Sequence, residues 1–450
     1  MEMAVAGGGS GKSTTWMVEV EKTVLEADAA AEVSRKAYQP QVVSLGSFHH
    51  GDPALLPMEE HKRRALRHLL RRAGRPLDDF VDAVEEVAEQ LECAYVDLGG
   101  EWRGDSVGGE ARERFMEMMI VDGCFLLEVM RTAAGKHLDD YASNDPIFSR
   151  HGVLYMVPYI RRDMLMLENQ LPLLVLERLL AVETERSSTT VPSRISNDDV
   201  INRMVLRFLS PSSRTPAAGE GLGLHPLDVY RRSMLHGAYD ARPRTREYYV
   251  PEGDTIRSAV ELYEAGIRFR RSRTDSLHDI RFRHGVLSMP AVAVDDTTEY
   301  MLLNMMAFER LHPGAGNDVT AYVFFMDNII DSAKDVALLS SNGVIQNAVG
   351  SDNAVAKLFN SISKDVVVEP ESALDDVHWQ VNAYFRQPWN MWRANLIHTY
   401  FRSPWAFLSL AAAVFLLVMT IMQTVYTVMS YYQQQQSSAG DGSTAAPPPM

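Results

Sequence analysis

The amino-acid sequence predicts a mainly α-helical domain with a small β-hairpin patch, followed by one C-terminal transmembrane helix. Three observations lead to this fold class. Apolar residues recur mostly at helical spacing, strand-like alternation is confined to one short stretch, and no charged residue lies between Arg402 and Asp441.

The composition limits the class of protein. The 450 residues include 44 Lys and Arg against 59 Asp and Glu, so the formal net charge is −15. Nucleic-acid binding is not expected, because it needs basic surface that displaces counterions from phosphates. Apolar residues at 46% and charged residues at 23% are ordinary globular values, which excludes wholesale disorder. Cys93 and Cys124 are too few for a disulfide framework, and we expect both to be buried thiols.

Residues 1–15 are rich in glycine and predict a flexible leader. Gly11, Lys12 and Ser13 fit a relaxed P-loop pattern, in which the lysine reaches phosphate oxygens and the serine holds Mg²⁺. A P-loop follows a buried strand, however, and only residues 1–5 are left to form one. Nucleotide binding is therefore the alternative hypothesis, and no cofactor is expected.

Residues 16–376 predict the helical domain. Helical spacing from residue 58 onward predicts two helices with a break at 74–76. The segments 113–130 and 164–180 are apolar on nearly all sides, so we expect both to be central helices.

The second half of this domain contains breaks and the strand-like patch. Segments 183–199 and 210–226 are rich in Ser, Thr, Pro and Gly and predict long loops or domain breaks. Residues 280–294 alternate as strands do, and His284 with Gly285 predicts the turn of a hairpin. Two further helices are predicted, over 299–310 and 322–339.

Several polar residues lie in or beside apolar segments and form the predicted structural polar motif. A buried carboxylate must be paired or protonated, so we predict that these residues pair with one another or with nearby arginines. For His49, His50, Glu59 and His61 the alternative is a zinc site, because imidazole and carboxylate are zinc ligands, but the spacing does not favour one and no metal is expected. The residues of the motif are His49, His50, Glu59, His61, Asp122, Glu168, Asn169 and Gln170, and Arg161, Arg162 and Asp163 lie in the same apolar surroundings.

Catalysis is not predicted. The sequence contains no nucleophile-elbow serine and no Cys–His arrangement that would activate a nucleophile, so the protein is not expected to be an enzyme. A cluster of arginines is interpreted as a solvated face, with binding to anionic lipid or to an acidic partner as the alternative. These arginines are Arg268, Arg270, Arg271 and Arg273.

Residues 405–428 predict the transmembrane helix. The 20 residues from Ala406 to Val425 rise about 1.5 Å each and so span about 30 Å, the thickness of a bilayer core. Trp405 and Tyr426 stand at the two edges, where aromatic rings favour the headgroup layer. A buried core helix is the alternative, but such helices are usually shorter and rarely run so far without a charge.

The flanks of this span predict its surroundings and orientation. Residues 377–404 predict an aromatic juxtamembrane helix, and the glutamine-rich residues 429–450 predict a disordered tail. Arg386, Arg393 and Arg402 precede the span and no Lys or Arg follows it. The positive-inside rule then places the N-terminal domain in the cytoplasm and the short tail on the far side.

Several short segments form a specific combination. They are Tyr38–Gly46 with His49–Gly51, Met58–Lys62, Asp122–Phe125 with Glu128, Leu167–Pro172, Asn304 with Ala307–Glu309, Trp389 with Trp392–Ala394, Tyr400–Phe401 and Pro404–Trp405. Together, over roughly residues 16–432, they resemble the plant family known as domain of unknown function 247. Ser47 departs from the proline that is usual in the family, the tract before Tyr38 is shortened, and the glycine-rich start is not part of the family pattern.

The resemblance implies a plant membrane protein without an assigned enzymatic activity. Some grass members of the family are associated with pollen–stigma self-incompatibility, which implies recognition. We therefore predict a single-pass membrane protein, at the plasma membrane, that contacts the bilayer through residues 405–428. Its helical domain is predicted to bind a protein or peptide partner, as a signalling or self-incompatibility-like recognition module.

Overall fold

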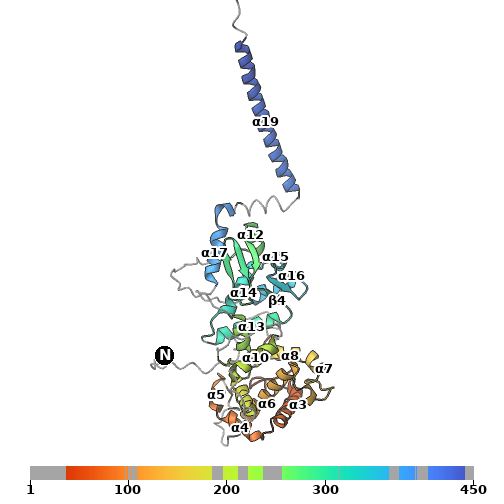
Figure 1. Cartoon of the computed structure of the whole chain (residues 1–450). Coiled ribbons are helices and arrows are strands. Elements are labelled where there is room, and N and C mark those ends of the chain that lie inside the picture. The colour runs from red at the N-terminus through yellow and green to blue at the C-terminus, as the bar shows by residue number, and fades with distance from the viewer. Residues whose placement is uncertain are drawn as a thin grey trace, which may run out of the picture.

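A computed structural model of the chain describes residues 37–96, 98–99, 102, 109–184, 196–210, 221–236, 256–312, 314–363, 374–390, 392 and 404–440. Helices dominate these residues and the strands form two small sheets, which confirms the predicted mainly α fold class. Figure 1 shows helices α3, α4 and α6 at one end of the domain, and the strands with α12 and α17 at the other. The predicted leader, residues 1–15, lies outside the described residues.

The first end of the domain is built around helix α6, Glu110–Ala133. Nearly every residue of α6 from Phe115 onward is buried, as its all-round apolar sequence predicts. The predicted pair of helices after residue 58 forms three, because the second is broken near Val87. They are α3 (Leu56–Ala73), which ends at Gly74 in the left-handed conformation, α4 (Leu77–Glu85) and α5 (Ala88–Cys93).

The predicted central helix over residues 164–180 is wrong in its first half. Helix α8 (Val157–Asp163) ends where that helix was expected to start, and α9 (Leu173–Thr184) begins only after Pro172. Residues 164–172 form turns instead. Proline disfavours the helical conformation of the residue before it, and polar side chains in this segment bond backbone groups that a helix would satisfy itself.

The far end of the domain combines two sheets with short helices. Strand β3 (Val286–Met289) is central, pairing in parallel with β1 (Arg268–Arg271) and antiparallel with β2 (Arg281–Arg283). The turn between β2 and β3 has positive φ at both His284 (50°) and Gly285 (76°), which suits a two-residue hairpin and confirms the predicted one. Strand β4 (Val292–Val294) pairs in parallel with β5 (Ile345–Asn347) in the second sheet.

The remaining helices connect and cover these parts. One continuous cluster of buried apolar side chains runs from Ala37 to Val381. The predicted helix over 322–339 forms two helices, since Ser332 and Asp335 make a capping box that starts a new one. The elements are η1 (Leu138–Asp140), α7 (Arg150–Tyr155), α10 (Asn197–Leu209), α11 (Pro226–Met234), α12 (Ala259–Glu264), α13 (Thr298–Leu311), α14 (Asp318–Ile329), α15 (Ala333–Ser341), α16 (Asp352–Ile362) and α17 (Asp375–Phe385).

Helix α19, Pro404–Gly440, is the long C-terminal rod in Figure 1. Its segment Ala411–Gln433 is long and apolar enough to cross a membrane, a window that starts later than the predicted Ala406. The helix also continues through residues 429–440, where we expected disorder, because glutamine and alanine are good helix formers. The side chains of Val425 and Tyr426 at the predicted edge are exposed.

The two cysteines are both free, but their burial differs from the prediction. Cys124 is buried within α6, whereas Cys93 is exposed. Cys93 ends the short helix α5, whose buried positions are taken by Ala88 and Leu91.

Candidate functional site

A dense set of buried polar contacts surrounds residues 41–46, the segment that precedes α3. The Asp163 carboxylate at the end of α8 accepts three hydrogen bonds from consecutive backbone N–H groups of this segment. They come from Gln41 (3.0 Å), Val42 (2.7 Å) and Val43 (2.9 Å). Burial raises the pKa of the Asp163 carboxyl, and the three N–H donors oppose that rise. Successive N–H groups of a strand point to opposite sides, so this segment forms an anion-binding turn around the carboxylate.

Asn169 holds the same segment. Its Oδ1 accepts a hydrogen bond from the N–H of Leu45 at 2.7 Å. Its Nδ2 donates to the carbonyl oxygens of Val43 and Asp163, both at 3.0 Å. A single fully buried amide therefore ties residues 41–46 to the end of α8.

A buried ion pair lies under the end of the segment. Lys62 of α3 is fully buried, and its Nζ lies 2.7 Å from Oδ1 of Asp122 in α6 and 2.6 Å from Oε1 of Glu59. It also donates to the Ser44 hydroxyl at 3.2 Å, and Asp122 Oδ2 accepts the N–H of Gly46 at 2.9 Å. Burial raises the pKa of the Asp122 carboxyl, while Lys62 and the Gly46 N–H act in the opposite direction.

Gly46 is required where it stands. Its φ is +73°, and an added Cβ would lie 2.5 Å from the Tyr95 hydroxyl oxygen and 2.7 Å from the Gln170 carbonyl oxygen. The Tyr95 hydroxyl itself donates to that carbonyl at 3.3 Å. Only glycine combines this conformation with this close approach.

Gln170 and Asn304 extend the network toward the rest of the domain. Gln170 Nε2 donates to the carbonyl oxygens of Met164 and Met166, and its Oε1 accepts the N–H of Leu227 in α11. Asn304 of α13 accepts the N–H of Leu167 at 2.7 Å. These amides supply the backbone bonds of the turns that replace the first half of the expected helix.

A separate charged cluster lies between α3, α6 and α9. The buried Glu128 carboxylate is paired with Arg72 and Arg131, and it accepts a hydrogen bond from Tyr141 at 2.8 Å. Glu183 pairs with the same two arginines. Burial alone would raise the pKa of Glu128, but the Arg72 guanidinium holds it below its usual value.

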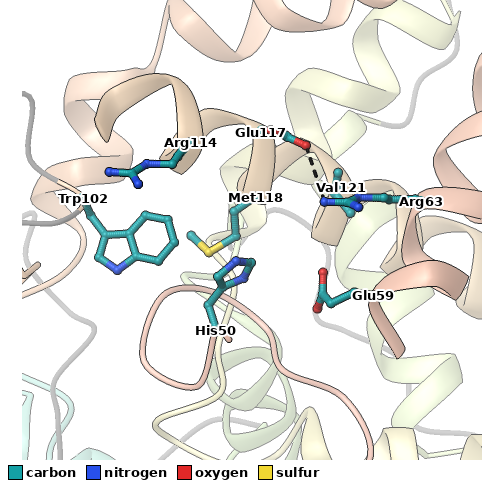
Figure 2. Close-up of a pocket in the computed structure, with 8 residues that line it drawn as sticks. All are labelled: His50, Glu59, Arg63, Trp102, Arg114, Glu117, Met118 and Val121. Atoms are coloured by element: carbon teal, nitrogen blue, oxygen red, sulfur yellow. Dashed lines mark ion pairs between the residues drawn. The ribbon is translucent and has the colours of Figure 1, made fainter. Parts of the chain in front are cut away.

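One surface pocket lies beside the buried network, with a volume of about 320 Å³. Figure 2 shows Trp102 and Arg114 on one side, Glu59 and Arg63 on the other, and Met118 between them. Glu59 links the pocket to the buried ion pair, because its carboxylate also contacts Lys62. The lining residues are His50, Glu59, Arg63, Trp102, Arg114, Glu117, Met118 and Val121.

The chemistry of this pocket suits binding. The His50 ring meets Trp102 edge to face at 5.2 Å, and Arg63 pairs loosely with Glu117 at 4.0 Å. The ionisable side chains among its lining residues are one imidazole, two carboxylates and two guanidinium groups, from His50, Glu59, Glu117, Arg63 and Arg114. An apolar floor with a mixed rim of arginine and glutamate fits a side chain that has an apolar body and polar ends.

Comparison with known proteins assigns the family. A family model described as a plant protein of unknown function, DUF247, matches residues 26–419. The chain belongs to this family. UPF0481 protein At3g47200 of Arabidopsis thaliana is 32% identical over 427 residues, which is 88% of this chain and 84% of the relative. A second Arabidopsis UPF0481 protein, At3g02645, is 22% identical over 523 residues, covering 93% of this chain and 95% of the relative. No solved structure matches the chain.

The structure of this DUF247 protein brings together most of the predicted polar motif. Residues 41–46 are held or adjoined by Glu59, Asp122, Asn169 and Gln170. The His49 ring lies 3.7 Å from the Glu168 carboxylate. The three histidines do not converge. His50 lines the pocket, whereas His61 lies near Arg64 and Asp145, and burial lowers its pKa.

One central member of the network, Lys62, was not among the predicted polar residues of this DUF247 protein, whereas Asp163 was. Lys62 lies on the buried face of α3 with Met58, Ala65 and Leu69. A lysine on the apolar face of a helix could have indicated from the sequence that this cation is buried and paired. The predicted nucleotide loop, with Gly11, Lys12 and Ser13, lies outside the described residues and outside the part matched by the family model.

Proposed function

We propose that this DUF247 protein is a single-pass membrane protein whose helical domain recognises a protein or peptide partner at the plasma membrane. The observation that carries the anchoring is α19. Its segment Ala411–Gln433 has a mean hydropathy of 1.9, and none of it is buried inside the molecule. Phe415 and Leu416, for example, are 63% and 64% exposed. So much apolar surface is unfavourable in water and matches the hydrocarbon core of a bilayer.

The charge pattern supports one orientation. Arg386, Arg393 and Arg402 lie before the span, and no Lys or Arg follows it. Because translocation disfavours flanking cations, the helical domain is proposed to face the cytoplasm.

The pocket supports recognition without catalysis. Interfaces that bind proteins are enriched in tryptophan and arginine near their centres, and Trp102, Arg63 and Arg114 occur together here. The buried ionisable side chains next to the pocket are engaged in holding backbone, as Asp122 holds Gly46. These buried side chains hold the pocket in shape, and the partner is proposed to contact the residues at its rim.

Alkaline carbonate extraction tests the anchoring. The full chain is expected in the membrane pellet, and a variant that ends at Ser403 in the supernatant. A glycosylation acceptor added after Met450 should be modified, and one added before Met1 should not. Recovery of the full chain in the supernatant would refute the anchoring, while the reverse glycosylation pattern would refute only the orientation.

Proximity labelling with the full chain tests the recognition site. Trp102→Ala and Arg63→Glu are expected to remove specific labelled proteins that the unmodified chain enriches. Because Trp102 is only 9% exposed and packs in the core, its replacement can also destabilise the domain, so Arg63→Glu is the decisive variant. Arg71→Glu, the same charge change at an exposed arginine of the same helix, is the matched control and should keep the labelled proteins. If both pocket variants label the same proteins as the unmodified chain, this pocket is not the recognition site.

A further inference from the structure

The register of the three-stranded sheet gathers arginines that are separated in the sequence. Arg268 of β1 and Arg283 of β2 both pair with Val286 of the central strand. Residues that are in register point to the same face of a sheet, so these two arginines flank Val286 in one row.

The neighbouring row repeats the pattern two residues along. Arg270 of β1 and Arg281 of β2 both pair with Ser288. Side chains alternate along a strand, so this row shares the face of the first. Adjacent strands lie about 4.8 Å apart, which places the two arginines of a row roughly 10 Å apart and the rows about 7 Å apart.

The opposite face of the sheet is buried and fixes which way the arginines project. Phe269, Phe282 and Leu287 are in register with one another between the two arginine rows, and all three are buried. Exposing these three apolar side chains to water would be unfavourable, so the other face of the sheet remains on the outside. We call it the four-arginine face, and it consists of Arg268, Arg270, Arg281 and Arg283.

Among the residues that the structure describes, few carboxylates balance the four-arginine face. Arg281 lies 3.2 Å from Asp279, while Arg270 donates to the Ser288 hydroxyl and Arg268 stacks over the Tyr263 ring. All four arginines are exposed. In a chain whose formal net charge is −15, this is a local concentration of positive charge against the overall sign.

The position of this face along the chain points to lipid. Helix α17 packs against the buried face of the sheet, opposite the four-arginine face, with the ring centroids of Tyr384 and Phe282 5.5 Å apart in an edge-to-face contact. The helix therefore leaves the four-arginine face uncovered. Only residues 386–403 separate α17 from α19, at most about 60 Å of extended chain. Trp389 and Trp392 in this interval are 80% and 73% exposed, and tryptophan favours the headgroup layer. Figure 1 shows the sheet and α17 at the same end of the domain.

We propose that the four-arginine face binds the anionic phospholipid headgroups of the membrane that holds α19. The proposal rests on the proposed anchoring and cytoplasmic orientation, since cytoplasmic leaflets carry phosphatidylserine and phosphoinositides. Each guanidinium offers a planar pair of donors to phosphate or carboxylate oxygens, and the two rows can engage several headgroups at once. Helices α3 and α6, which carry pocket residues, lie at the other end of the domain from the sheet (Figure 1), so the pocket is separate from this face.

The test uses the full chain in lipid nanodiscs and measures the rate at which phenylglyoxal modifies each arginine. One set of nanodiscs contains phosphatidylcholine alone, and the other adds phosphatidylserine. The four arginines are expected to react several-fold more slowly in the anionic nanodiscs, and high salt should abolish the difference. Arg67 and Arg71, exposed residues of α3 at the other end of the domain, are internal controls and should react equally in both.

A variant with all four arginines changed to glutamine provides a second measurement. In a full chain whose other four tryptophans are changed to phenylalanine, phosphatidylserine should restrict quenching of Trp389 and Trp392 by an aqueous quencher. The four-glutamine variant in the same background should lose this effect. Equal reactivity of the four arginines in both nanodiscs would overturn the proposal. Protection seen only in native membranes with their proteins would assign the face to an acidic protein instead. A chain that fails to enter nanodiscs would refute the anchoring and is recognised separately.

Discussion

Removing the buried cation Lys62 is the most direct test of the network around residues 41–46. The Lys62→Met change keeps most of the side-chain volume but leaves the Asp122 carboxylate without its charged partner. Asp122 is 1% exposed, so water cannot replace the lysine. The Gly46 N–H donates to the same Asp122 carboxylate, so Gly46 loses this hydrogen bond as well if the carboxylate moves.

The expected cost follows from this burial. Removing one partner of a buried ion pair typically destabilises a protein by about 3–5 kcal/mol. For a domain of this size about 2 °C of melting temperature corresponds to 1 kcal/mol, so the midpoint should fall by about 6–10 °C. The double variant K62M/D122N should recover at least half of the loss, because the amide oxygen still accepts the Gly46 N–H and no unpaired charge remains.

The measurement is thermal unfolding of the full chain in detergent, followed by tryptophan fluorescence. Lys136→Met, at an exposed lysine, is the matched control and should leave the midpoint unchanged. Acid should reduce the penalty of K62M, since protonation neutralises the stranded carboxyl. A midpoint within 2 °C of the unmodified protein, or a double variant no more stable than K62M, would refute the reasoning.

Three further predictions use the same unfolding assay. Gly46→Ala should cost about 1–3 kcal/mol more than Gly51→Ala, because both have positive φ but only Gly46 would clash; equal costs would contradict the close approach. Burial lowers the pKa of His225 to about 4, against an ordinary value near 6.5, so the folded protein keeps this imidazole neutral while the unfolded chain binds a proton. About 3 kcal/mol of stability should therefore disappear as pH falls from about 6.5 to about 4, and His225→Asn, unlike His284→Asn at the exposed hairpin turn, should flatten that dependence. Deleting residues 1–13 should leave the melting temperature and partner labelling unchanged, and loss of measurable ATP or GTP binding on deletion would favour the P-loop alternative.

The sequence predicted which polar residues are buried better than what they bond. Asp122 and Asn169 stand out as polar groups within apolar runs, and such groups need partners. Their partners include the N–H groups of Gly46 and Leu45, which are 76 and 124 residues away along the chain. The sequence of residues 41–46 does not indicate that buried side chains hold this backbone, so these contacts could be found only from the structure.

The error over residues 164–172 has a related cause. Helical spacing of Met164, Leu167 and Leu171 predicts one helical face, and all three are buried as the pattern requires. Burial was predicted correctly while the backbone was not, since Gln170 bonds the carbonyls of Met164 and Met166 with its side chain. Periodicity reports which side chains are buried, and a turn stabilised by amides can bury the same residues as a helix.

For the arginines of β1 and β2, the sequence indicated exposure but not which residues share a face. Arg268 and Arg270 were interpreted as part of a solvated face, together with Arg271 and Arg273. The register adds Arg281 and Arg283 from β2 to the same face. Arg271 is in register with Met289, so it belongs to the opposite face, and it pairs with Asp275. Pairing between β1 and β3 is parallel and joins segments that no hairpin connects, so the combined face could not be predicted from spacing.

A buried ion pair often contributes little net stability, because desolvation offsets its attraction, so its retention needs another explanation. In this fold Lys62, Asp122 and Asp163 fix the register of residues 41–46, and that segment leads directly into the loop with His50. Glu59 contacts Lys62 from one side and lines the pocket from the other. Loosening the ion pair should therefore displace two walls of the pocket together. K62M/D122N still anchors Gly46 but leaves Glu59 without Lys62, so we expect this variant to lose the proteins that Arg63→Glu loses in proximity labelling. Retention of those proteins would show that the pocket and the buried network are independent.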